Sequence, residues 1–170
     1  MAKNKTVCYY VLSNGAIEEK NAQFEQPHQG MQSHLKRLYI RVKVEQVGIN
    51  KVLVDGGSAL NLMPQFMLKK LGMFNTDVKP HNMVLSNYEG KIGQTLGVFQ
   101  VDLIVGSITR PTMFMVIPAK VNYNLLLGRE WIHGIGAVPS TMHQRVSIWR
   151  EDGVVEIKWI WQTSIEIWRI

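Results

Sequence analysis

Hydrophobic and polar residues alternate between Leu38 and Glu45, with a hydrophobic side chain at every second position. A period of two is typical of a β-strand that buries one face. A second apolar run, residues 52–54, follows the turn-forming sequence Gly-Ile-Asn at residues 48–50. The pattern therefore predicts a β-hairpin with its turn at residues 48–50.

The remaining hydrophobic runs are short and are separated by residues that interrupt regular structure. Residues 64–71 predict a short helix, because Pro64 suits a first helical turn and Gly72 suits a helix end. Residues 129–133 predict at least one more helical turn. Strands are predicted at residues 83–86, 96–105, 113–117, 124–128, 146–149 and 154–157. Many short strands with one or two short helices indicate a mostly β protein, either a compact barrel or a sandwich.

The same pattern divides the 170 residues into three parts. Residues 1–34 are interpreted as a polar N-terminal linker or tail, because residues 13–33 show neither the helical nor the strand period. Residues 35–158 contain the predicted core and have the length of one domain. Residues 159–170 contain three of the five tryptophans and have no assigned place in that core.

Composition narrows the class of protein. With 46% hydrophobic and 19% charged residues, the chain can bury a core, which excludes overall disorder. Its longest uncharged apolar runs fall well short of the ~20 residues of a membrane-spanning helix. The apolar run near the N-terminus is too short for a signal peptide. We therefore expect an intracellular, cytoplasmic protein that does not associate with membranes.

Cysteine, histidine and basic residues argue against three kinds of site. The single cysteine, Cys8, excludes an internal disulfide and a multi-cysteine metal site. The five histidines lack the paired spacing of metal ligands, so we expect no metal and no cofactor. The net charge is +6, but the 19 Lys and Arg residues are scattered along the chain. Nucleic acid is therefore not an expected partner, although a small β-barrel that binds single-stranded nucleic acid stays an alternative.

Asp55 is the most informative polar residue. It follows the apolar run 52–54 directly and precedes Gly56, Gly57 and Ser58. A carboxylate at the end of a buried strand is costly unless hydrogen-bond donors or a function retain it. Gly57 allows a backbone N–H to approach the carboxylate, and the Ser58 hydroxyl is a second possible donor. From these residues alone, Asp55 is either a functional acid or a turn cap.

Three segments in order resemble the motifs of retropepsins, the single-lobe aspartic proteases of retroviruses and retrotransposons. Residues 52–59, Val-Leu-Val-Asp-Gly-Gly-Ser-Ala, resemble the catalytic-aspartate motif. Residues 124–132 resemble the second signature, in which Leu126, Leu127 and Gly128 lead into a helix. Residues 86–93 stand where the family has its flap hairpin, with Asn87, Tyr88, Glu89 and Gly90 at the flap. The similarity covers residues 35–157 and is greatest to proteases of plant Ty3/Gypsy-type retrotransposon polyproteins.

The resemblance implies a single-lobe β-barrel and an aspartic endopeptidase. One catalytic aspartate per chain implies a homodimer, in which the two Asp55 residues meet and activate water to cut an extended peptide or polyprotein. The family has Ser or Thr after the aspartate, where this chain has Gly56. That departure keeps a second reading open: a catalytically silent dimerisation or peptide-binding module of the same fold.

The sequence also predicts the location of two further residues near the second signature. Trp131 is expected in the core. Arg129 is expected to be a solvated residue at a helix start, with a carboxylate near the dimer interface as its alternative partner.

Overall fold

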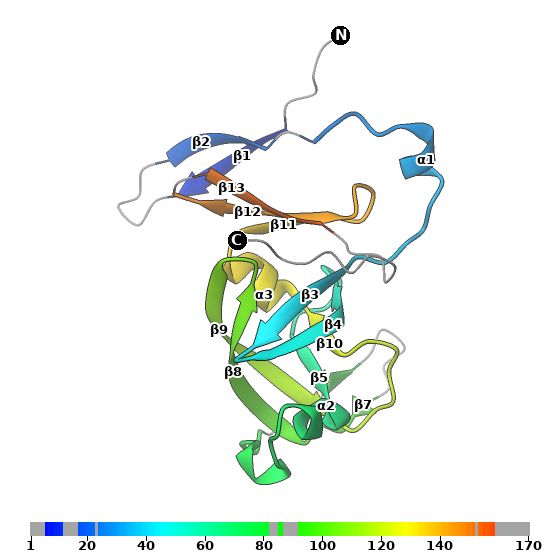
Figure 1. Cartoon of the computed structure of the whole chain (residues 1–170), viewed down its shortest axis with the longest axis vertical. Helices are drawn as coiled ribbons and strands as arrows, with labels where there is room; N and C mark the ends of the chain where they lie inside the picture. The colour runs from blue at the N-terminus through cyan, green and yellow to red at the C-terminus, as the bar shows by residue number, and fades with distance from the viewer. Residues whose placement is uncertain are drawn as a thin grey trace.

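A computed structural model describes residues 6–11, 17–22, 24–81, 85–86, 92–151 and 153–158. Six strands close into a barrel with the order β10-β4-β3-β8-β9-β5 (Figure 1). Their bounds are β3 Tyr39–Val44, β4 Val47–Val54, β5 Leu62–Pro64, β8 Gly97–Val105, β9 Ile108–Ile117 and β10 Leu125–Leu127. The mostly β architecture and the closed barrel confirm the predicted fold class.

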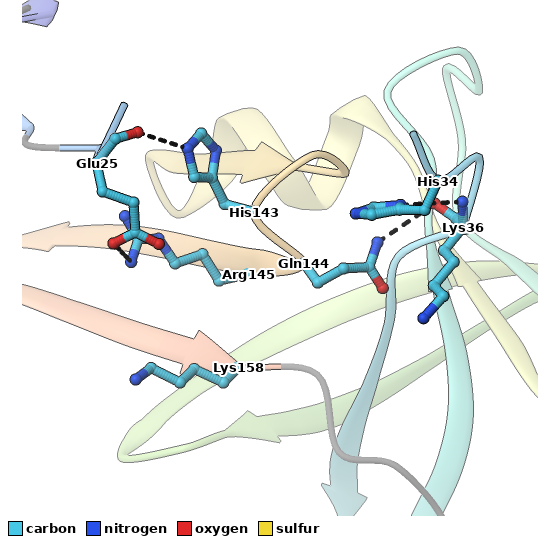
Figure 2. Close-up of a pocket in the computed structure, with 7 residues that line it drawn as sticks. All are labelled: Glu25, His34, Lys36, His143, Gln144, Arg145 and Lys158. Carbon is cyan, nitrogen blue, oxygen red and sulfur yellow. Dashed lines mark hydrogen bonds and ion pairs between the residues drawn. The ribbon is translucent and has the colours of Figure 1, made fainter. Parts of the chain in front are cut away.

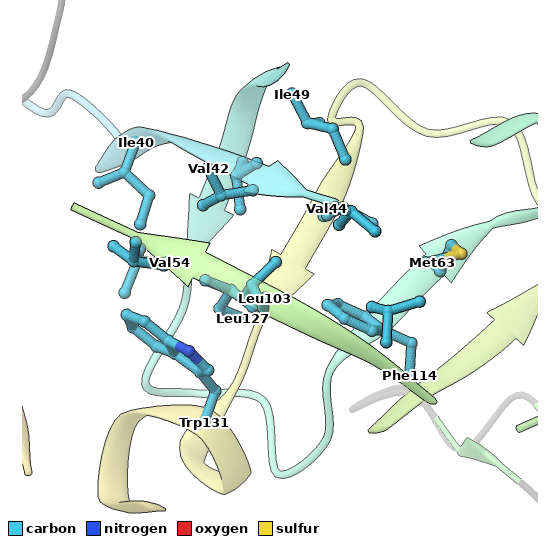
Figure 3. Close-up of a cluster of buried hydrophobic side chains, with 14 of the residues drawn as sticks. Ile40, Val42, Val44, Ile49, Val54, Met63, Leu103, Phe114, Leu127 and Trp131 are labelled. Atoms are coloured by element: carbon cyan, nitrogen blue, oxygen red, sulfur yellow. The ribbon is translucent and has the colours of Figure 1, made fainter. Parts of the chain in front are cut away.

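Alternating side chains of the strands fill the barrel. In β3, Ile40, Val42 and Val44 are each at most 2% exposed, whereas Arg41 and Lys43 between them face solvent. Strand β8 follows the same alternation. Figure 3 shows these β3 side chains in one buried cluster with Leu103 of the neighbouring strand β8 and Phe114 of β9. The period of two in the sequence thus identified the inward face of the barrel correctly.

The turn between β3 and β4 lies earlier than predicted. The strands separate at Glu45 and Gln46, and the expected turn residues 48–50 lie inside β4, where Ile49 pairs with Val42. Ile49 is fully buried, so the longer strand buries apolar surface that a turn at residues 48–50 would expose. Glu45 takes the left-handed backbone conformation that the tight turn needs, with φ 53°.

The described helices are short. Helix α2, Gln65–Lys70, begins after Pro64 and ends before Gly72, whose φ is 72°, as the sequence predicted. Helix α3, Arg129–Gly134, follows β10 and contacts both β10 and the later strand β11, Ala137–Ser140. A further α-helix α1, Gln29–Gln32, and a 3₁₀ turn η1, Asn75–Asp77, complete the set. None of these helices has the length and hydrophobicity to cross a bilayer.

A second sheet, β11-β12-β13, lies above the barrel in Figure 1. Its strands are β11 Ala137–Ser140, β12 Arg145–Arg150 and β13 Gly153–Lys158. The predicted hairpin at residues 146–157 is confirmed as β12 and β13. Strand β11 was not predicted, because Gly136 and Pro139 give its sequence the character of a loop. The edge position of β11 in the sheet accommodates the proline.

The N-terminal region contains regular structure that the sequence pattern did not predict. Strands β1, Thr6–Val11, and β2, Ile17–Ala22, form an antiparallel pair. Both strands lie within residues 1–34, and the interpretation of that region as a linker or tail stays a prediction. Strand β2 has the sequence Ile-Glu-Glu-Lys-Asn-Ala, which lacks an apolar face, so its strand state depends on pairing with β1. The domain boundaries remain predictions.

A second short pair of strands comes from the segment before β8. Strands β6, Leu85–Ser86, and β7, Ile92–Gly93, pair antiparallel, with Leu85 opposite Gly93. The predicted flap residues Asn87, Tyr88, Glu89 and Gly90 lie outside the described residues, as does segment 159–170.

Candidate active site

The barrel brings the first and second sequence motifs together. Strand β10 pairs parallel with β4, so that Leu127 lies beside Val54 at the strand ends. The pairing continues one residue further, where the Asp55 backbone N–H donates to the Leu127 carbonyl at 3.0 Å. Leu126 and Leu127 are both buried. Asp55 therefore stands at the end of a strand whose position is fixed by the core.

The loop after β4 holds the Asp55 carboxylate in one orientation. The Gly57 N–H donates to Asp55 Oδ1 at 2.8 Å, as the sequence predicted for this glycine. The Ser58 N–H donates to the Asp55 carbonyl at 3.2 Å and closes the turn. The expected donation from the Ser58 hydroxyl to the carboxylate is wrong, because that hydroxyl donates to the Leu60 carbonyl at 2.8 Å. Asp55 itself is half-buried.

Gly128 lies where two backbone segments come very close. A Cβ at this position would be 2.4 Å from the Leu60 carbonyl oxygen and 2.7 Å from that of Ser58, so only glycine fits without moving the loop. The next residue ties the same segments together, since the Arg129 N–H donates to the Ser58 carbonyl at 2.8 Å. The second signature thus supports the loop that carries Asp55.

Asn61 connects the two motifs and was not predicted from the sequence. It is 1% exposed, and its Oδ1 accepts the Gly128 N–H at 2.9 Å. Its Nδ2 donates to the Met113 carbonyl at 3.0 Å and to the Glu130 carboxylate, which also pairs with Arg110 at 2.9 Å. The sequence feature that could have pointed to Asn61 is its polar side chain between two leucines in an apolar stretch.

Arg129 has a more specific role than the expected solvated helix start. The residue is exposed, as predicted, but its Nη1 donates to the carbonyl oxygens of Gly56 and Gly57, at 3.2 and 3.3 Å. These contacts tie the first residue of α3 to the loop that follows β4. Trp131, two residues further along α3, is 1% exposed and confirms the expectation that it lies in the core.

Gly56, the departure from the retropepsin motif, has space around it. A Cβ built there meets nothing within 4 Å, and its φ is outside the left-handed region. A serine or threonine would therefore fit at this position without backbone strain.

Tyr123 is a second residue that the sequence reasoning missed. Its pKa is raised above the ordinary value of 10.0, first by burial and then by the negative charge of Asp55. The phenol thus lies close enough to the candidate acid to sense its charge. The sequence feature that could have pointed to Tyr123 is its position just before the second signature. Among the described residues, no group of three His, Cys, Asp or Glu side chains is placed to hold a metal ion.

Comparisons with known proteins identify the fold. No protein-family model and no curated protein sequence matches the chain. The chain is similar to the retroviral protease-like domain of Ddi1 from Leishmania major, with a TM-score of 0.58 and 16% identity, over 79% of this chain and 98% of that domain. It is also similar to the EIAV protease solved with an inhibitor, with a TM-score of 0.52 and 19% identity, over 64% and 96% of the two chains. The chain therefore has the retropepsin-like fold.

Proposed function

We propose that this chain is an aspartic endopeptidase that acts as a homodimer, with Asp55 of each subunit forming the catalytic pair. The observation that carries the proposal is the position of Asp55. It stands at the end of a core strand, with Oδ1 fixed by the Gly57 N–H and its loop supported by Gly128 and Arg129. The retropepsin-like fold supports the same proposal. Residues 52–59 resemble the catalytic-aspartate motif of that family.

The proposed chemistry uses two carboxyl groups that share one proton. Two adjacent carboxyl groups do not both ionise at neutral pH, because their negative charges would repel each other. The ionised carboxylate removes a proton from water as its oxygen attacks the scissile carbonyl carbon. The protonated carboxyl group donates its proton to the carbonyl oxygen. The tetrahedral diol then breaks its C–N bond as the protonated carboxyl group donates its proton to the leaving nitrogen and the ionised carboxylate takes a proton from a diol hydroxyl. This releases two peptides and restores the shared proton.

The substrate in this proposal is an extended peptide, bound by backbone pairing along the site. The finer assignment is to the polyprotein of a plant Ty3/Gypsy-type retrotransposon, which the protease would cut at its internal junctions. Support for it comes from the sequence motifs at residues 52–59 and 124–132.

Gly56 supports a second candidate, a catalytically silent module with the same fold. In the family motif, a Ser or Thr at this position reaches the partner subunit by hydrogen bonds, and Gly56 provides no hydroxyl. Titration with a transition-state-mimicking peptide inhibitor separates the two candidates. An active protease loses turnover in proportion to the added inhibitor and reaches zero at one inhibitor per two chains, whereas a silent module has no turnover to titrate.

Replacing Asp55 by asparagine tests the catalytic assignment. Asp55→Asn removes the ionisable oxygen at nearly constant volume and keeps an acceptor for the Gly57 N–H, so the fold should persist and proteolysis should fall to background. Asp102→Asn is the matched control, because Asp102 is exposed on β8 and should keep turnover within a few-fold. Turnover and the unfolding midpoint are measured for both. Persistent turnover in a clean Asp55→Asn preparation contradicts the assignment.

A further inference from the structure

Residues 24–36, which we call the connecting segment, join β2 to β3 and contain the short helix α1. In front of α1, His143 Nε2 lies 3.0 Å from the Glu25 carbonyl oxygen. The Phe24 ring packs on the His143 ring with a centroid distance of 4.9 Å. This end of the connecting segment is thus attached to the turn between β11 and β12, to which His143 belongs.

Behind α1, the connecting segment is attached to the same turn a second time. His34 Nε2 lies 3.1 Å from the Met142 carbonyl oxygen, and Gln144 Nε2 donates to the Lys36 carbonyl at 3.3 Å. Figure 2 shows His34 and Lys36 grouped with Gln144, apart from the contact of Glu25 with His143. Helix α1 buries none of its residues, and a helix of one turn is not stable alone. Its order therefore depends on the attachments at its two ends.

The hydrogen bonds of His34 determine its protonation state. The Met142 carbonyl is only an acceptor, so His34 Nε2 carries a hydrogen. The Lys36 backbone N–H donates to His34 Nδ1 at 3.3 Å, so Nδ1 carries none. A proton on Nδ1 would point two N–H groups at each other. The attached segment therefore requires the neutral form of the His34 ring.

His143 has no such requirement. Its Nε2 also faces a carbonyl oxygen, but its Nδ1 lies 2.7 Å from the Ser140 hydroxyl oxygen. A hydroxyl group can donate to a neutral imidazole and accept from a protonated one. The Ser140 oxygen already accepts the His143 backbone N–H at 3.2 Å. His143 can therefore stay attached in both protonation states.

Charged groups of both signs lie around the two histidines. Arg145 Nη1 of β12 is 3.6 Å from the carboxylates of Glu25 and Glu156. The charged and titratable groups that line the same cavity as His34 are Glu25, Lys36, His143, Arg145 and Lys158. Carboxyl, ammonium and guanidinium groups in water keep their charge between pH 7.5 and pH 5.5, whereas imidazole titrates in this range. The difference between His34 and His143 thus follows from their hydrogen bonds.

We propose that His34 is a pH-sensitive switch, which holds the connecting segment on the β11–β12 turn at neutral pH and releases it in mild acid. The attached state excludes the proton that the detached state binds, so a fall in pH favours detachment. A histidine in a free chain has a pKa of about 6.5, so the ratio of detached to attached chains should rise about tenfold between pH 7.5 and pH 5.5. The switch uses no residue of the Asp55 loop and is independent of the proposed proteolysis.

Hydrogen exchange of the full chain at pH 7.5 and pH 5.5, corrected for the intrinsic exchange rates, tests this proposal. The amides of residues 31–33 donate the hydrogen bonds of α1 and should open about tenfold more often at pH 5.5. Peptides from β8 report on the barrel and should not change. His34→Gln keeps a donor for the Met142 carbonyl and does not titrate, so it should remove the response. His143→Gln is the matched control and should keep it.

Imidazole ¹⁵N chemical shifts of the unmodified chain provide a second measurement. At pH 7.5 they should show His34 with its hydrogen on Nε2. This measurement and His143→Gln decide the question even if His34→Gln detaches the segment at every pH. The proposal is overturned by corrected exchange at residues 31–33 that does not depend on pH, or by a response that persists in His34→Gln. A response that disappears in His143→Gln, or a hydrogen on His34 Nδ1 at pH 7.5, overturns it equally.

Discussion

At the scale of single residues, two glycines near Asp55 have opposite surroundings. Gly128 faces the carbonyl oxygens of Leu60 and Ser58 at distances that no Cβ tolerates, whereas Gly56 faces open space. Gly128 is therefore a packing requirement of the site. Gly56 is a position where a side chain is allowed but absent.

The contrast predicts different costs for the same substitution. Gly128→Ala forces two backbone segments apart and should lower the free energy of unfolding by about 1–3 kcal/mol, as overpacking does in cores. Gly56→Ala should change it by less than about 0.5 kcal/mol, as at an ordinary exposed site. Urea denaturation of both variants measures the difference. Equal unfolding midpoints would contradict the close approach at Gly128.

Substitution of Gly56 by a hydroxyl-bearing residue is predicted to increase dimer affinity and activity. Gly56→Ser or Gly56→Thr restores the hydroxyl of the family motif, and each hydrogen bond contributes about 0.5–1.5 kcal/mol, with two copies in a symmetric dimer. The dimer dissociation constant should fall by about tenfold or more. Sedimentation equilibrium and specific activity at low concentration are the measurements. Folded variants that dimerise no better than the unmodified chain would favour the silent module.

The sequence identified those site residues whose role depends on local order in the chain. Asp55, Gly57 and Gly128 were found because an apolar strand followed by Asp-x-Gly, or by Gly and a helix, is a local pattern. Asn61 and the Arg129 contacts were missed, because their partners come from distant segments and only the closed barrel brings them together. The Ser58 hydroxyl was misassigned for a similar reason, since a nearby carbonyl accepts its proton.

At the scale of elements, the same distinction applies. Strands with one apolar face, such as β3 and β8, were predicted from their period of two. Strands β2 and β11 were not, because β2 has no apolar face and β11 contains a proline. The turn of the first hairpin lies earlier in the chain than predicted. Strand β4 includes the turn-forming residues 48–50, because this arrangement buries Ile49.

The segment leading into β10 predicts a dependence of stability on alkaline pH. The pKa of Tyr123 is raised in the folded chain, so the native state keeps this proton when the unfolded state loses it. The stability that the neutral phenol provides is complete below pH 10 and should be lost as pH rises through the folded pKa. Tyr123→Phe lacks this titration, so the free energy of unfolding of the unmodified chain should fall relative to that of Tyr123→Phe as pH rises above 10. Parallel pH profiles would contradict the burial of Tyr123 beside Asp55.

At the scale of the whole molecule, the described chain carries one Asp55 site, and the proposed chemistry needs two carboxylates. The fold supports this requirement, because the end of β4 places Asp55 half-exposed at the surface, where a second copy can approach it.

Subunit mixing tests most directly whether catalysis requires Asp55 from both chains. The unmodified protein is mixed with an equal amount of the Asp55→Asn chain at a protein concentration above the dimer dissociation constant. After the subunits have exchanged, turnover of a peptide substrate is measured. If the site needs both aspartates, mixed dimers are inactive and total activity falls to about half, because about a quarter of all dimers keep two active chains. Activity that stays at the unmixed level would show that each chain acts alone, and would contradict the shared catalytic pair.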